Sequence, residues 1–237
     1  MQTCPACQRR FNVPVPIERA PTPWERRGEL GFVQAVWQTL KQTMLHPDTF
    51  WSSVRPEAPW VDAMLYGWML TVVGAVLQVP FNMLTFSTMR RQMESAMAAG
   101  GPTPPEFERV MGWVSDNAAG LSGGFALATI VLYPLSFVLS GAVIHLGCLI
   151  FGANRNGFGA TLRVVGYSSA PVLLAWVPAV GGAAGLYVLV LEIWGIYKVQ
   201  ETTVGRAIGG VLSLTVGLVC CSCGVLGAGA VTMLLQR

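Results

Sequence analysis

Long apolar runs separated by short polar segments dominate the chain from residue 58 onward. The stretch from Tyr167 to Gln200 contains one charged side chain, Glu192, before Lys198, and a break at residues 178–182 divides it into two apolar halves. With residues 161–166 added in front, each half is about 18 to 20 residues long, enough to cross a bilayer core of roughly 30 Å. The pattern therefore predicts a hairpin of two antiparallel membrane-spanning helices.

Three further apolar runs have the length of a membrane span. The pattern predicts these helices at residues 59–86, 121–151 and 207–235, with bends at Pro80 and Pro134. Residues 87–120 are more polar and predict a connection outside the membrane. The expected fold is therefore all-α: a polytopic membrane helix bundle in which residues 58–237 form five transmembrane helices.

Residues 30–51 show a different pattern, in which apolar side chains recur at the spacing of one helical face and polar residues interrupt the run. We interpret this segment as an amphipathic helix that lies in the headgroup region, with Trp37, Phe50 and Trp51 as interfacial anchors. The alternative is a helix packed on the cytoplasmic end of the bundle. The apolar positions of the face are Val33, Val36, Trp37, Leu40 and Met44.

Residues 1–29 contain five prolines and five arginines, which predicts a flexible, exposed N-terminal arm. The arm includes Cys4-Pro5-Ala6-Cys7, and the CxxC spacing is typical of the knuckle of a zinc ribbon. The second cysteine pair of such a ribbon is absent. The alternatives are an inert knuckle, a zinc ion at Cys4 and Cys7 completed by a second chain, and a redox pair; no other cofactor is expected.

Composition supports the membrane assignment, because 53% of the residues are hydrophobic and only 11% are charged, against about 25% in soluble domains. A net charge of +3 argues against a nucleic-acid-binding protein. The predicted topology puts eleven lysines and arginines on one side of the membrane and four on the other. The excess predicts a multi-pass protein of the cell membrane with a cytoplasmic N-terminus and a C-terminus outside.

Two ionisable residues fall within the predicted spans. His145 lies six residues before the end of the second span, and Glu192 lies six residues before Lys198 at the end of the fourth. Both are about 9 Å from the inner end of their helix, so we expect them to approach each other or to share a polar cavity. The alternatives are a structural hydrogen bond that fixes the register of the bundle and no contact at all. Three nearby residues would join this intramembrane polar site: Asn154, Arg155 and Arg163.

The order of the elements resembles the Yip family (Ypt/Rab-interacting protein domain), in its bacterial branch, over residues 30–235. The residues that carry the resemblance are Pro47-x-x-Phe50-Trp51, Tyr167-x-x-x-Pro171, Pro178-x-x-Gly181, Trp194-Gly195 and Gln200-Glu201-Thr202-Thr203-x-x-Arg206-Ala207. The resemblance implies five spans and, for eukaryotic members, a link to vesicle traffic and to small GTPases bound through a long N-terminal region. The N-terminal arm of this chain is short and basic, so GTPase binding is not carried over.

No enzyme signature is present: the chain contains no P-loop, GxSxG or HExxH motif. The first hypothesis is a non-enzymatic scaffold that organises or shapes membranes or serves trafficking, with the lipid bilayer as its partner and a homo-oligomer as its expected assembly. The alternative is a small transporter, channel or lipid-moving protein that uses the polar site around His145 and Glu192. The sequence names no protein partner.

Overall fold

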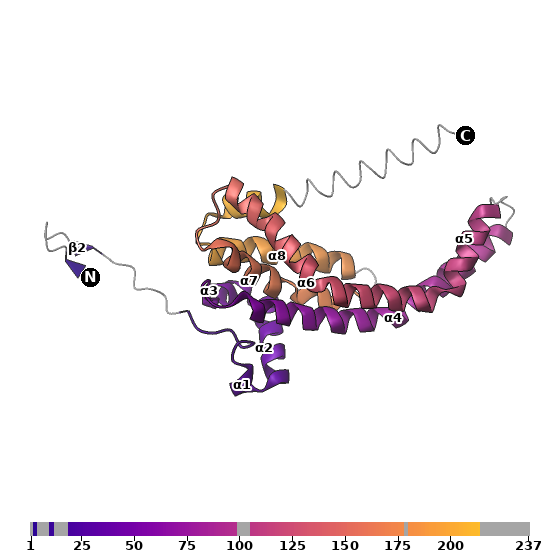
Figure 1. Cartoon of the computed structure of the whole chain (residues 1–237), viewed down its shortest axis with the longest axis horizontal. Helices are drawn as coiled ribbons and strands as arrows, with labels where there is room; N and C mark the ends of the chain where they lie inside the picture. Colours follow the sequence, from indigo (N-terminus) through magenta and orange to yellow (C-terminus); the bar gives the residue numbers. More distant parts are fainter. Residues whose placement is uncertain (1, 4–9, 12–18, 99–104, 178–179, 214–237) are drawn as a thin grey trace.

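A computed structural model describes residues 2–3, 10–11, 19–98, 105–177 and 180–213. Two long helices, α4 (Trp60–Ala98) and α6 (Ala118–Ile150), run side by side, and α5 (Pro105–Asp116) lies between them in the chain at one end (Figure 1). The opposite end is covered by α7 (Gly157–Ser168), the 3-10 helix η1 (Ala170–Leu174) and α8 (Val180–Val199). A further helix, Val204–Ser213, follows α8.

The N-terminal part contains three helices, α1 (Arg27–Leu30), α2 (Phe32–Leu45) and α3 (Pro47–Ser53). It also contains a short antiparallel pairing of β1 (Gln2–Thr3) with β2 (Arg10–Phe11), in which Gln2 is opposite Phe11. The predicted zinc ligands Cys4 and Cys7 lie outside the described residues.

Three helices have the length and apolar composition of a membrane span: Trp60–Thr88 within α4, α6, and α8. Two of the five predicted spans are not seen as continuous helices. Residues 161–177 are divided between α7 and η1, because the helix ends at Ser168 and Pro171 follows within the next turn. The last predicted span begins as the helix Val204–Ser213, and its remainder lies outside the described residues.

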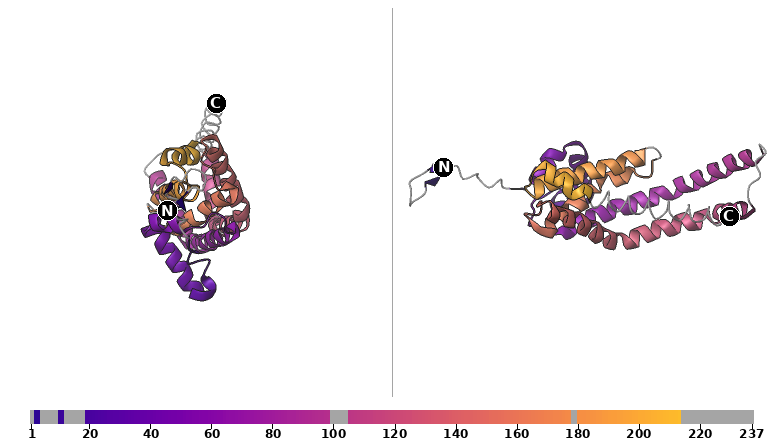
Figure 2. Two further views of the ribbon diagram at one scale, coloured as in Figure 1. Left: turned by 90° about the vertical axis from the view of Figure 1, so that its left-hand side faces the viewer. Right: turned by 90° about the horizontal axis from the view of Figure 1, so that it is seen from above.

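The helix α4 is longer than the predicted span of residues 59–86. It continues to Ala98 through residues that are polar but favour helices, and it is not interrupted at Pro80. As a result, α4 and α6 extend well beyond the end of α8 (Figures 1 and 2).

The centre of the packed end is α7, in which every residue from Ala160 to Ser168 is buried. The helix α3 closes one side of this core with Phe50 and Trp51, which are 1% and 0% exposed. Trp51 packs against Gly195 of α8, where an added Cβ would lie 3.2 Å from the indole ring. The sequence expectation that Phe50 and Trp51 anchor the chain at the membrane interface is therefore wrong, because both rings fill the core.

The helix α2 runs across the direction of α4 and α6 and projects from the side of the bundle (Figures 1 and 2). Its packed side combines the small buried residues Ala35, Thr39 and Thr43 with the partly buried Val36, Leu40 and Met44, which pack against the core. Trp37 on the other side is 62% exposed. The helix thus shares features of both sequence interpretations, because it packs on the bundle and also presents an apolar side outward.

Candidate functional site

A buried ion pair between Arg163 of α7 and Glu25 of the N-terminal segment is the centre of the polar site. The Arg163 side chain is 0% exposed and that of Glu25 is 7% exposed. One terminal nitrogen of Arg163, Nη2, donates to Oε1 of Glu25, and the other, Nη1, donates to the carbonyl oxygen of Pro59 at 2.8 Å. Because an unpaired charge at this depth is costly, each group requires the other.

Further donors surround the Glu25 carboxylate. The Tyr167 hydroxyl donates to Oε1 at 3.3 Å, and Arg55 donates to Oε2 at 3.4 Å. The hydroxyls of Tyr167 and Thr22 lie 3.0 Å apart, and the Arg163 guanidinium lies 5.6 Å from the Tyr167 ring centroid. Arg163 and Tyr167 are one turn apart on α7, so the helix itself places the cation beside the ring.

A local motif presents Glu25 to this site. The backbone N–H of Thr22 donates to Oε2 of Glu25 at 3.0 Å, and the backbone N–H of Glu25 approaches the Thr22 hydroxyl oxygen at 3.4 Å. This reciprocal arrangement has the hydrogen-bond pattern of a capping box, formed around the turn that precedes α1, and its sequence signal is Thr22-Pro23-Trp24-Glu25. The sequence analysis missed this signal, although it is readable at those four positions.

Other contacts hold the same segment against the bundle. Arg27 pairs with Asp62 of α4 at 2.9 Å, and the Trp24 indole N–H donates to the Asp62 carbonyl oxygen at 2.7 Å. Arg19 pairs with Glu201, which follows α8, at 2.8 Å. Residues 19–29 therefore differ from the flexible arm expected over residues 1–29, because Arg19, Trp24, Glu25 and Arg27 have partners outside the segment.

A second polar network joins α6, α7 and the end of α8. The His145 Nδ1 atom lies 3.0 Å from the Thr161 hydroxyl, to which the Gln200 amide also donates at 3.0 Å. Gln200 further accepts from the backbone N–H of Asn156 at 2.7 Å and donates to the carbonyl oxygen of Gly157. The network satisfies the backbone of the turn between α6 and α7 with one fully buried amide side chain.

The predicted site residues are only partly brought together. His145 forms a hydrogen bond with Thr161, and Arg163 pairs with Glu25. Within the described ranges, no hydrogen bond or ion pair joins Glu192 to His145 or to Arg163. Asn154 and Arg155 lie in the connection between α6 and α7, where Asn154 is half-buried and Arg155 is exposed. The side chain of the next residue, Asn156, donates to the Val199 carbonyl oxygen of α8 at 2.6 Å.

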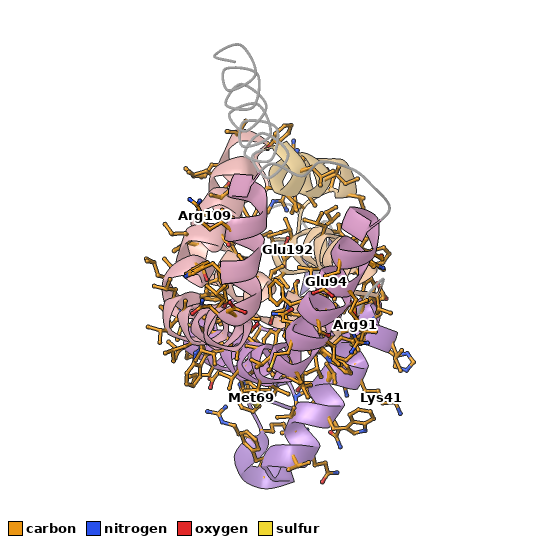
Figure 3. All side chains as sticks on the ribbon, turned by 90° about the vertical axis from the view of Figure 1, so that its right-hand side faces the viewer. Lys41, Met69, Arg91, Glu94, Arg109 and Glu192 are labelled. Atoms are coloured by element: carbon orange, nitrogen blue, oxygen red, sulfur yellow. The ribbon has the colours of Figure 1, made fainter. Side chains whose placement is uncertain are left out.

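Glu192 lies on α8 inside the ring of helices (Figure 3) and is 7% exposed. The side chain is therefore buried, and the approach to His145 or shared polar cavity expected from the sequence stays a prediction. In the part of the chain that the structure describes, no three His, Cys, Asp or Glu side chains are grouped so as to hold a metal ion. A role for Glu192 in a functional site stays a prediction.

The sequence of this chain was compared with models of known protein families. The family model described as the Yip1 domain matches residues 41–225, which is more than half of the chain. The chain belongs to the Yip1 domain family. Neither a search of curated proteins nor a search of solved structures gave a match.

The matched range places the site within the Yip1 domain of this protein. Arg163, Tyr167 and Gln200 all fall within residues 41–225, whereas Glu25 and Thr22 precede the matched region. The ion pair therefore connects the Yip1 domain to the segment in front of it. The bacterial branch and the zinc ribbon expected from the sequence stay predictions.

Proposed function

We propose that this Yip1 domain protein is a non-enzymatic scaffold that organises or shapes the cell membrane, or serves trafficking, through an in-plane helix fixed to a membrane-spanning bundle. The observation that carries the proposal is the exposed apolar side of α2. Val33 and Trp37 are 79% and 62% exposed and lie one turn apart, and Phe32 and Leu45 at the two ends of the helix are also exposed. A helix with such a side inserts at the boundary between headgroups and acyl chains.

The orientation of α2 supports this action. A helix lying across the spanning helices is parallel to the membrane plane, so its outward side chains enter one leaflet only. The ion pair between Arg163 and Glu25, together with the packing of Trp51, makes the attachment of α2 to the bundle stiff. Added volume in one leaflet, held at a fixed angle to the spans, favours curvature of the bilayer.

The proposed topology has five spans, with α7 and η1 as the third and the helix beginning at Val204 as the fifth. The proposed N-terminus is cytoplasmic, which puts α2 at the cytoplasmic leaflet. We also propose a homo-oligomer, because several α2 helices inserted side by side would bend the bilayer more strongly than a single one. Zinc at Cys4 and Cys7, completed by a second chain, belongs to the same proposal.

Reconstitution into liposomes tests the proposed action of α2. The full chain is expected to produce narrow vesicles or tubules visible by electron cryomicroscopy, at a protein-to-lipid ratio where protein-free vesicles keep their diameter. Trp37→Glu combined with Val33→Glu is expected to abolish the effect, because two carboxylates oppose insertion. The matched control is Gln34→Glu, an exposed polar position on the same helix. Tubules that persist in the double variant would contradict the proposal.

The alternative is a small transporter, channel or lipid-moving protein that uses His145 and Glu192. The observation in its favour is the buried carboxyl group of Glu192, since ionisable residues within spans often mark transport paths. Flux of protons or small ions into liposomes that is lost in Glu192→Gln, with vesicle shape unchanged by the wild-type chain, would favour this alternative.

A further inference from the structure

A cleft lined by both apolar and polar side chains lies between α4 and α6 next to η1. It has a volume of about 320 Å³, and its polar lining consists of Thr71, Gln78 and Asn82 from α4 and Ser122 and Thr129 from α6. All five residues lie within the two long candidate spans. Polar groups at this depth need hydrogen-bond partners, because hydrocarbon provides none.

Two of the five residues have their hydrogen bonds satisfied by their own helix. The Thr71 hydroxyl donates to the Gly67 carbonyl oxygen and the Thr129 hydroxyl donates to that of Phe125, each at 2.9 Å. The other three differ. Ser122 is 2% exposed and its hydroxyl has no partner, and among the described residues the amides of Gln78 and Asn82 also have none.

The spacing of these groups directs them to one place. Gln78 and Asn82 are four residues apart and therefore share a face of α4, and Ser122 faces them from α6. Three unpaired donors thus converge on one cavity, where an ester carbonyl or a glycerol oxygen would accept their hydrogen bonds.

A second cavity, of about 540 Å³, continues toward the α5 end and shares Phe86 with the first. Its lining contains one cation, Arg91, and two carboxylates, Glu94 and Asp116. Figure 3, viewed from this end, shows Arg91 and Glu94 on α4. Arg91 is nine residues beyond Asn82, about 14 Å along the helix, so the charges lie above the amides at the level of a membrane surface.

We propose that these two adjoining cavities together bind a zwitterionic phospholipid whose headgroup ends in a primary ammonium. Gln78, Asn82 and Ser122 bind the glycerol and ester oxygens. Arg91 binds the phosphate, and Asp116 accepts a hydrogen bond from the ammonium group. The acyl chains lie along the lipid-facing sides of α4 and α6. The site is at the opposite end of α4 from the Glu25 ion pair, so it does not depend on the proposed action of α2.

The charges distinguish a lipid from other occupants. The chain's own residues 214–237 contain one charged side chain, Arg237, which does not match a lining with charges of both signs. A zwitterionic headgroup supplies an anion for Arg91 and a cation for Asp116. A second copy of the chain is an outcome that the experiment below can reveal.

Native mass spectrometry of the full chain in detergent, titrated with phosphatidylethanolamine, phosphatidylcholine or phosphatidylglycerol, tests the proposal. We expect phosphatidylethanolamine to be retained about tenfold more strongly than the other two lipids. Arg91→Gln and Asn82→Leu are each expected to lower this retention about tenfold. The matched control is Arg109→Gln, because Arg109 is an exposed arginine of α5 outside the cavity lining.

Two results would overturn the proposal. One is equal retention of the three lipids by the wild-type chain, and the other is an unchanged preference in Arg91→Gln and Asn82→Leu when both variants keep the elution volume of the folded protein. Ser122→Ala, which removes only one oxygen atom, keeps the test valid if the larger change at Asn82 prevents folding. Disulfide-linked dimers formed by Gln78→Cys in place of lipid retention would show that a second copy fills the cleft.

Discussion

Gly166 of α7 lies so close to Ala63 of α4 that a Cβ atom added to Gly166 would be 2.6 Å from both the carbonyl carbon and the carbonyl oxygen of Ala63. No real side chain fits at that distance from a backbone. The absence of a side chain at residue 166 therefore sets how closely α7 approaches α4, and with it the position of Arg163 one turn earlier on the same helix.

Gly166→Ala is expected to destabilise the protein by about 1–3 kcal/mol, because the two backbones must separate to admit the methyl group. The measurement is the unfolding temperature of the chain in detergent. Gly185→Ala in α8 is the matched control, since no atom lies within 4 Å of an added Cβ there. Equal unfolding temperatures for the two variants would show that the close approach is unimportant.

Glu25→Ala leaves Arg163 buried without its carboxylate, which is expected to cost about 3–5 kcal/mol. The segment in front of α2 should then detach, and trypsin should cleave faster after Arg26 and Arg27. Glu29→Ala is the control, because among the described residues Glu29 pairs with Arg26 alone, in an exposed contact worth about 0–1 kcal/mol. Similar cleavage rates in the two variants would argue against an anchoring role for Glu25.

The ion pair between Asp48 of α3 and Lys198 of α8 predicts a pH dependence at acidic pH. A hydrogen bond from Lys198, at 2.8 Å, lowers the pKa of Asp48 below its ordinary value of 3.8. A carboxyl group with a lowered pKa stabilises the fold above its unfolded-state pKa, and this contribution disappears as the pH falls through the lowered value.

The difference in unfolding temperature between the wild-type chain and Asp48→Asn should therefore be constant from pH 7 to about pH 5 and should shrink below about pH 4. Asp48 is exposed, so the expected difference is small, and it should also decrease with added salt. A difference that grows on acidification would contradict the assignment.

The elements that could be predicted from the sequence are those set by local pattern. Apolar runs of sufficient length identified the spans within α4, α6 and α8. The apolar face predicted for α2 is divided in the structure, because Val36, Leu40 and Met44 pack against the core whereas Val33 and Trp37 are exposed. The family assignment over residues 41–225 confirmed the resemblance read from short motifs.

The elements that could not be predicted depend on contacts between distant parts of the chain. Glu25 and Arg163 are separated by 138 positions, and no periodicity links them. The proline and arginine content of the N-terminal arm predicts an exposed segment. Only the structure reveals that Glu25 in this arm has a buried partner, Arg163. The pairing expected between His145 and Glu192 was based on equal depth alone, which does not specify the side of the helix that faces a neighbour.

The burial of α7 on all sides has a consequence for biosynthesis. Arg163 cannot rest in lipid without a partner, and an unpaired arginine there costs about 3 kcal/mol or more. Its partner Glu25 leaves the ribosome long before α7, whereas Gln200, which bonds to Thr161 in the same helix, leaves long after it. The helix α7 can therefore complete its contacts only after synthesis has passed residue 200. The bundle is thus expected to finish packing late, once α8 and the residues after it can contact α7.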